Sequence, residues 1–75
     1  MISLNKIKLG DICRVVDIKS DLSMSRRFLD IGIIPDAIIE KVLVSPFKGI
    51  SAYYIMGATI AIRDKDAEGI MVSYG

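Results

Sequence analysis

The chain has 75 residues, which is enough for one hydrophobic core and too few for two separate domains. A domain of this size buries only about 60% of the surface that its unfolded chain exposes, so its core must be rich in apolar side chains. The sequence meets this requirement, because 52% of its residues are apolar and they are spread evenly along it. We therefore expect a single domain that spans residues 1–75.

Three short apolar segments have the composition of β-strands: residues 12–18, 37–44 and 70–72. In the first segment, Ile12, Val16 and Ile18 share one face of the predicted strand. The second segment is apolar apart from Glu40 and Lys41, which predicts a strand that is buried on much of both faces.

Two further apolar segments have the spacing of a β-hairpin. Residues 50–56 and 59–63 flank the dipeptide Gly57-Ala58. A two-residue connection is the commonest hairpin loop, and a leading glycine is typical of a type II′ turn. We therefore expect an antiparallel strand pair with its turn at Gly57 and Ala58.

One helix is indicated by Met24, Phe28 and Ile31, which are four and three residues apart and share one helical face. Ser23 is a residue type that caps helix N-termini, and Gly32 is the type that ends helices in a left-handed conformation. The predicted helix therefore runs from Ser23 to Ile31.

The predicted elements together favour a mostly β fold. Residues 64–68 are polar and predict one helical turn, which Asp64 caps and Gly69 ends. About five short strands, with one helix between the first and the second, are too few to close a large sheet. They can instead curl into a small, partly open barrel that covers most of its own edges.

The composition argues against several functional classes. The sequence has no histidine, so the commonest general base and the commonest transition-metal ligand are both missing, and we do not expect an enzyme. The net charge is +1 and the basic residues are scattered from Lys6 to Lys65, which argues against nucleic acid as a partner. The apolar runs are far shorter than the roughly 20 residues that cross a bilayer, so we expect no membrane insertion.

The N-terminal residues and the cysteine content favour a cytoplasmic location. Residues 1–9 alternate apolar and polar side chains and lack the pattern of a signal peptide. The chain has one cysteine, Cys13, and a small secreted domain would usually need several. Cys13 lies between apolar neighbours and has no histidine to activate it, which is typical of an inert, buried thiol.

No segment has the pattern of a metal or cofactor site, and we expect neither group. Asp64, Asp66 and Glu68 are close together, but they lack the glycine and the ligand spacing of a calcium loop. Three methionines are expected to fill the core: Met24, Met56 and Met71.

Two pairs of neighbouring residues are candidates for contact with a partner. Arg26 and Arg27 lie on the predicted helix and point in different directions, where either could contact an acidic group. Tyr53 and Tyr54 alternate across a predicted strand, so one ring is expected in the core and the other on the surface. An exposed tyrosine is a common interface residue.

The series RFLDIGIIP from Arg27 to Pro35 is followed by an apolar strand, by IAIR at residues 60–63 and by AEGIMV at residues 67–72. This pattern covers nearly the whole chain and resembles the FeoA family of ferrous-iron-transport proteins. Asp36 stands where the family usually has a glycine, and aspartate tolerates the left-handed turn expected there at some cost.

The resemblance implies an SH3-like small barrel that is cytoplasmic and accessory to the Fe(II) transporter FeoB. The implied partner surface is the cytosolic GTP-binding region of FeoB. Carried over residue by residue, the resemblance gives four candidate partner-binding positions: Arg26, Arg27, Asp30 and Arg63.

Two alternatives to this reading stay open. The same domain type resembles the C-terminal SH3-like domain of metal-dependent transcriptional repressors, which would make the chain a regulatory or dimerisation module. A small enzyme that uses Cys13 or the cluster at Asp64 is the least favoured class. A homo-oligomer is compatible with both binding roles, because a short barrel with exposed strand edges can pair through them.

Overall fold

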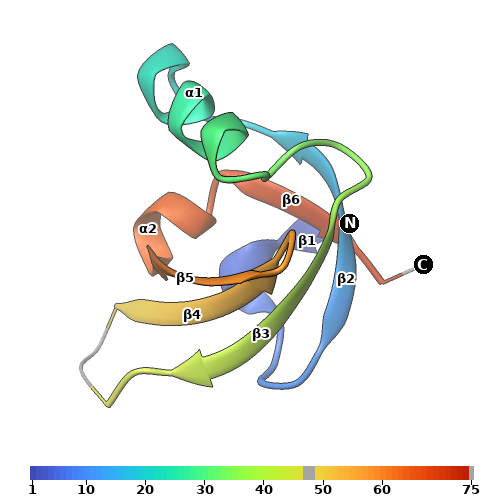
Figure 1. Ribbon diagram of the computed structural model, residues 1–75, viewed down its shortest axis with the longest axis vertical. Coiled ribbons are helices and arrows are strands. Elements are labelled where there is room, and N and C mark those ends of the chain that lie inside the picture. Colours follow the sequence, from blue (N-terminus) through green and yellow to red (C-terminus); the bar gives the residue numbers. More distant parts are fainter. Residues whose placement is uncertain (47–48, 75) are drawn as a thin grey trace.

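The computed structural model describes residues 1–46 and 49–74, which form one antiparallel sheet with two helices (Figure 1). The strands are β1 (Ile2–Ser3), β2 (Ile12–Ile18), β3 (Ile38–Val44), β4 (Ile50–Ile55), β5 (Ala58–Arg63) and β6 (Ile70–Ser73). The helices are α1 (Leu22–Asp30) and α2 (Asp64–Ala67), and a single 3₁₀ turn, η1, covers Leu4–Lys6. The spatial order β1-β6-β2-β3-β4-β5 leaves β1 and β5 as the two edges of the described sheet.

The mostly β class and the short helix between β2 and β3 confirm the prediction, although the described sheet has six strands instead of about five. The additional strand is β1, which pairs with β6 through only two residues. The N-terminal segment therefore contributes structure that its alternating sequence did not reveal. Leu4 and Ile7 from this segment are both buried in the core.

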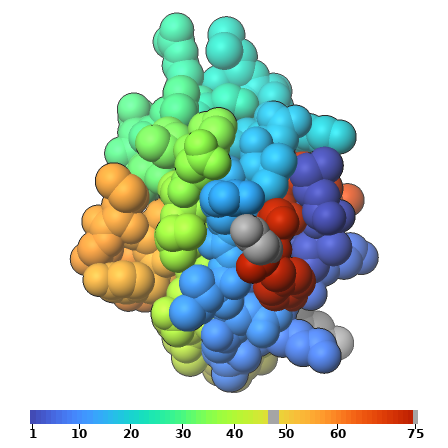
Figure 2. Space-filling model, turned by 90° about the vertical axis from the view of Figure 1, so that its right-hand side faces the viewer, coloured from blue at the N-terminus to red at the C-terminus, as the bar shows by residue number. Residues whose placement is uncertain are grey.

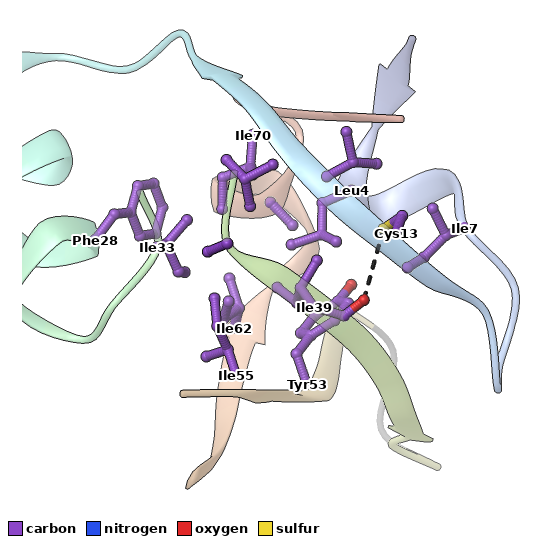
Figure 3. Close-up of a cluster of buried hydrophobic side chains, with 14 residues drawn as sticks. Leu4, Ile7, Cys13, Phe28, Ile33, Ile39, Tyr53, Ile55, Ile62 and Ile70 are labelled. Carbon is purple, nitrogen blue, oxygen red and sulfur yellow. Dashed lines mark hydrogen bonds between the residues drawn. The ribbon is translucent and has the colours of Figure 1, made fainter. Parts of the chain in front are cut away.

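One hydrophobic core lies inside the curled sheet, and Figure 3 shows its buried side chains converging from several elements. Its members in the described residues are Leu4, Ile7, Cys13, Val15, Phe28, Ile33, Ala37, Ile39, Tyr53, Ile55, Ile62, Ala67, Ile70 and Val72. Phe28 and Ile33 lie side by side at the end of this cluster that is next to α1 (Figure 3). Tyr53 is fully buried and Tyr54 is exposed, which confirms the expected division of this pair.

β2 buries the face opposite to the one that carries Ile12. Cys13 and Val15 are in the core, whereas Ile12 is 56% exposed. Both faces of this strand carry β-branched residues, so alternation did not decide between them. The register to β6 shifts between Val15 and Asp17, and the following residue Ile18 packs against the core.

β3 is buried mainly on one face, so the predicted burial of both faces is wrong. Ile39 and Lys41 face the core, whereas Ile38 is exposed. The buried ammonium group of Lys41 donates a hydrogen bond of 3.0 Å to the carbonyl oxygen of Ile7. It also lies 5.9 Å from the centre of the Tyr53 ring, where a cation is attracted to the π face. These contacts offset part of the free-energy cost of removing the Lys41 ammonium group from water.

The hairpin between β4 and β5 turns one residue earlier than predicted. Its central residues are Met56 and Gly57, whose φ angles are 51° and 81°, and Ile55 pairs with Ala58. Two positive φ angles define a type I′ turn, so the predicted type II′ turn at Gly57-Ala58 is wrong. This placement leaves the Met56 side chain 70% exposed instead of in the core.

Helix α1 is capped by Asp21, whose carboxylate accepts a hydrogen bond of 2.8 Å from the backbone N–H of Met24. The predicted cap at Ser23 is wrong, because this residue lies inside the first turn. The predicted stop at Gly32 is confirmed by its φ angle of +96°. A Cβ atom at Gly32 would lie 2.6 Å from Cγ of Met56, so glycine also lets the hairpin tip approach α1.

Three other local predictions have clear outcomes. The helical turn after β5 is confirmed as α2, although its N-cap is Arg63 and not Asp64. The left-handed turn at Asp36 is confirmed by a φ angle of 72°. The predicted break between β3 and β4 falls on residues 45–49, of which positions 47 and 48 lie outside the described residues.

Replacing Asp21 with alanine removes the acceptor for the N–H of Met24, and we expect the free energy of unfolding to fall by about 1 kcal/mol. The matched control is Ser23→Ala, which changes an exposed residue of the first turn and should cost less than about 0.5 kcal/mol. Urea unfolding followed by circular dichroism measures both variants. A larger loss for Ser23→Ala than for Asp21→Ala would contradict the observed cap.

Candidate functional site

A groove with a volume of about 410 Å³ separates α1 from the junction of β5 and α2, and we call it the α1–β5 groove. Figure 1 shows α1 above α2 and β5, so the two walls come from distant parts of the sequence. The apolar lining consists of Met24, Phe28, Ile31, Ala61 and Ile62. The charged lining consists of Arg27, Arg63, Lys65 and Asp66.

Apolar side chains of α1, spaced three and four residues apart, form one wall of this groove. Met24, Phe28 and Ile31 share a helical face, as predicted, but they are buried to different degrees. Phe28 is only 3% exposed, whereas Met24 is half-buried and Ile31 is exposed. The face that the sequence assigned to the core therefore also supplies the apolar wall of the groove. Arg27 lies beside it and is exposed.

The charged side chains of the opposite wall come from the end of β5 and from α2. Arg63 is the last residue of β5 and the N-cap of α2, so the change from strand to helix places it at the mouth of the groove. Lys65 and Asp66 follow in α2. Within the described residues, no ion pair engages Arg27, Arg63 or Lys65. Their positive charge is therefore free to act on a bound group.

The structure brings together two of the four predicted partner-binding residues. Arg27 and Arg63 line the same groove from opposite walls, although they lie far apart in the sequence. Arg26 and Asp30 are exposed on α1 but do not line the groove. Sequence reasoning missed Lys65, because a lysine in a polar turn gives no sign of what it faces across the fold.

A second surface lies on the outer side of the sheet, which we call the open sheet face. Figure 2 shows this side, where β2 and β3 reach the surface below α1. It holds a shallow hollow of about 490 Å³, lined by Ile12, Asp36, Ala37, Ile38, Glu40, Tyr54 and Met56. Tyr54 is 48% exposed there, which makes it the surface tyrosine that the strand alternation predicted.

Neither the acidic cluster nor Cys13 has the surroundings of a reactive site. Among the described residues, no three histidine, cysteine, aspartate or glutamate side chains gather as metal ligands would, Asp64, Asp66 and Glu68 included. Cys13 is 3% exposed and its Sγ lies 3.7 Å from the carbonyl oxygen of Ile39. Burial, and secondly the negative charge of Asp11, raises the pKa of the Cys13 thiol to about 11. A thiol that stays protonated is a poor nucleophile.

Comparisons with known proteins identify the fold and the family. The family model described as the FeoA domain matches residues 2–74. No curated protein matches the chain. The solution structure of the FeoA protein from Chlorobium tepidum is 25% identical, with a TM-score of 0.88 over 95% of this chain and 68% of that protein. Neither helix of the described residues has the length and apolar character needed to cross a membrane.

Two other solved structures are similar in fold. FeoA from Stenotrophomonas maltophilia, described as an SH3 domain protein complexed with zinc, is 17% identical, with a TM-score of 0.83 over 97% of this chain and 91% of that protein. This similarity confirms the predicted SH3-like architecture. A manganese-dependent transcriptional repressor in complex with manganese is 29% identical, with a TM-score of 0.87 over 95% of this chain and 35% of that repressor.

The Cys13 thiol should not react with a disulfide reagent at pH 8 in the folded protein and should react fully in urea. Because the folded-state pKa of about 11 lies above the roughly 8.5 of an unfolded cysteine, the folded state keeps a proton that the unfolded state releases. The free energy of unfolding should therefore fall as the pH rises above about 8.5.

The pH dependence is measured by urea unfolding between about pH 7 and 10, with Cys13→Ala as the variant that lacks this group. The wild-type chain should lose stability over this interval and the variant should lose less. Rapid modification of the folded protein, or a wild-type stability that rises with pH, would contradict the buried, protonated thiol.

Proposed function

Since the chain belongs to the FeoA family, we propose that it is a small cytoplasmic accessory protein of ferrous iron uptake. In this role it acts as a single domain, binds the cytosolic GTP-binding region of a FeoB-type transporter, and supports the transporter's assembly or activity. Its work is binding and not catalysis. The S. maltophilia FeoA has been suggested to act as a bacterial ferrous iron transport activating factor, which is in line with this role.

The observation that carries the proposal is the α1–β5 groove with its basic lining, which no ion pair engages within residues 1–46 and 49–74. A binding site needs apolar surface for affinity and placed charges for orientation and partner choice. Phe28 and Ile62 supply buried apolar floor, and Arg27 and Arg63 supply charge from both walls. The partner is expected to present apolar and acidic side chains to this groove.

The four positions given by the family resemblance have different roles in this proposal. Arg27 and Arg63 are both exposed and contact the partner from the two walls of the groove. Arg26 and Asp30 lie on the exposed side of α1 and contact the partner only at the periphery of the docking surface. Charged residues at a periphery chiefly alter the association rate, whereas those in the contact centre determine affinity.

A second candidate function is a regulatory or dimerisation module of the kind found in metal-dependent repressors. The observation that favours it is the match to a manganese-dependent repressor at 29% identity, which covers 35% of that protein. In this role the domain would contact another protein domain and not DNA. A salt-sensitive, sequence-specific gel shift of operator DNA by this chain would contradict both functions.

The double substitution of Arg27 and Arg63 by glutamate should weaken binding to the purified GTP-binding domain by about tenfold or more, because it places like charges against an acidic partner surface. The control is Arg14→Glu on exposed β2, away from the groove, where Arg14 lies 3.9 Å from Asp36. Because one substitution changes the charge half as much as the double variant, Arg27→Glu and Arg63→Glu are also measured singly against it. Isothermal titration calorimetry measures the affinities, and circular dichroism checks that each variant is folded.

The control should bind within about twofold of the wild-type affinity, since charges outside a contact surface have weak effects. Loss of binding in Arg14→Glu with full binding in the double variant would place the contact on the open sheet face. That result would contradict the groove as the docking site. No binding by the wild-type chain would contradict the proposed partner itself.

A further inference from the structure

Strand β5 is an edge strand along its whole length in the described sheet. It pairs with β4 on one side, from Ala58 opposite Ile55 to Arg63 opposite Ile50. No strand of residues 1–46 or 49–74 pairs with its other side. An unpaired strand edge presents N–H and C=O groups that a further extended chain can bind.

The hairpin register determines which peptide groups of β5 face outward. In a two-residue hairpin the closing pair, here Ile55 and Ala58, exchanges hydrogen bonds, and bonded pairs then alternate with unbonded ones along the strands. Ala58, Ile60 and Ile62 therefore bond to β4. The pattern continues past the strand, because the N–H of Asp64 donates to the carbonyl oxygen of Gly49 at 2.7 Å.

Of the remaining residues of β5, Thr59 and Ala61 direct both their N–H and C=O groups away from β4, and Arg63 directs its N–H outward. The C=O of Arg63 belongs to α2, because this residue is the N-cap of that helix. Within the described residues, no strand pairs with these outward groups. Outward groups at alternate positions are what an added strand requires, and β5 offers three such N–H groups and the C=O groups of Thr59 and Ala61.

The α1–β5 groove borders the C-terminal half of this edge, from Ala61 to Arg63. Ala61 and Ile62 point to opposite faces of the sheet, yet both line the groove. A cavity lined from both faces of a strand borders its edge and does not cover one face alone. A chain that enters the groove therefore lies beside the outward peptide groups of β5, with Met24 and Phe28 of α1 across from them.

We propose that the α1–β5 groove binds an extended segment of the protein partner, which pairs with β5 as an additional strand. Alternate side chains of this segment point to opposite sides, so apolar ones pack against Met24 and Phe28 while acidic ones approach Arg27 and Arg63. Main-chain hydrogen bonds supply affinity and the side-chain contacts supply selectivity. The identity of the partner rests on the proposed function, whereas the mode of binding does not.

Charge complementarity favours an acidic partner segment over a second copy of this chain. The groove is lined by three basic side chains, Arg27, Arg63 and Lys65, and by one acidic side chain, Asp66. Pairing two β5 edges would bring two such basic surfaces together, and like charges at an interface oppose association. An extended segment of alternating apolar and acidic residues meets the opposite charge instead.

Amide hydrogen exchange measured by NMR tests the pairing directly. The first probe is the purified GTP-binding domain of the transporter, and the second is a synthetic peptide of alternating valine and glutamate. Ile60 and Ile62 should already exchange slowly in the free chain, because their N–H groups bond to β4. On binding, the amides of Thr59, Ala61 and Arg63 should become protected by about tenfold or more.

The matched variants are Ala61→Pro and Ala61→Val. Proline removes an outward N–H without removing a bond to β4, and it is tolerated on edge strands. It should weaken binding by about tenfold or more. Valine enlarges a groove-lining side chain but keeps the N–H, so Ala61→Val should lose clearly less affinity than Ala61→Pro. If Ala61→Pro does not fold, the exchange measurement on the wild-type chain still decides.

The outcomes separate this inference from the proposed function. Binding of the GTP-binding domain without protection of Thr59, Ala61 and Arg63, or with full affinity in Ala61→Pro, overturns strand pairing and leaves the proposed function intact. Protection by the peptide alone supports strand pairing and overturns the proposed partner. Protection by neither probe overturns the inference. Protection that increases with the concentration of the free chain would assign the edge to a second copy and overturn the acidic partner.

Discussion

The burial of Phe28 attaches α1 to the sheet, and the shape of the molecule depends on this contact. The ring is 3% exposed and lies beside Ile33 at the end of the core (Figure 3). Removing such a ring costs about 3 to 5 kcal/mol, a large share of the roughly 5 to 15 kcal/mol that stabilises a domain. Without this anchor, α1 would keep only the partial packing of Met24 against the core, and Arg27 would be held less firmly across from Arg63.

The same anchor explains why a small barrel has a groove at all. Helix α1 is nine residues long and fully buries only Phe28, whereas Met24 on the same face is half-buried and the following Ile31 is exposed. Gly32 ends the helix in a left-handed conformation and leaves room for Met56 at the hairpin tip. The C-terminal end of the helix therefore lies close to the hairpin tip, and the groove lies between α1 and the junction of β5 and α2.

The order and type of most elements followed from the sequence because composition and turn residues act locally. The helix stop at Gly32 and the left-handed turn at Asp36 are examples. The buried face of β2 did not follow, since apolar residues such as Ile12 and Val15 occupy both faces and a bulge alters the alternation. Strand β1 was also missed, because a two-residue strand is defined by its partner β6 and not by its own pattern.

The candidate site was only partly visible in the sequence. Arg27 and Arg63 were selected through the resemblance to the FeoA family, but their position on opposite walls of one groove depends on the topology that brings β5 beside α1. The sequence does not reveal the roles of Lys65 and of the outward peptide groups of β5. Both roles depend on which residues lie opposite them in the folded chain. Site geometry of this kind depends on contacts between distant segments, which single-sequence patterns do not encode.

The central claim is that the α1–β5 groove is the surface through which this FeoA-family chain binds its partner. The most direct measurement is an amide chemical-shift titration of the isotope-labelled chain with the purified GTP-binding domain of its transporter, with and without nucleotide. Saturable shifts at Arg27, Ala61 and Arg63 are the predicted result. Shifts confined to the open sheet face, at Ile12, Ile38 and Tyr54, or no shifts at a saturating partner concentration, would contradict it.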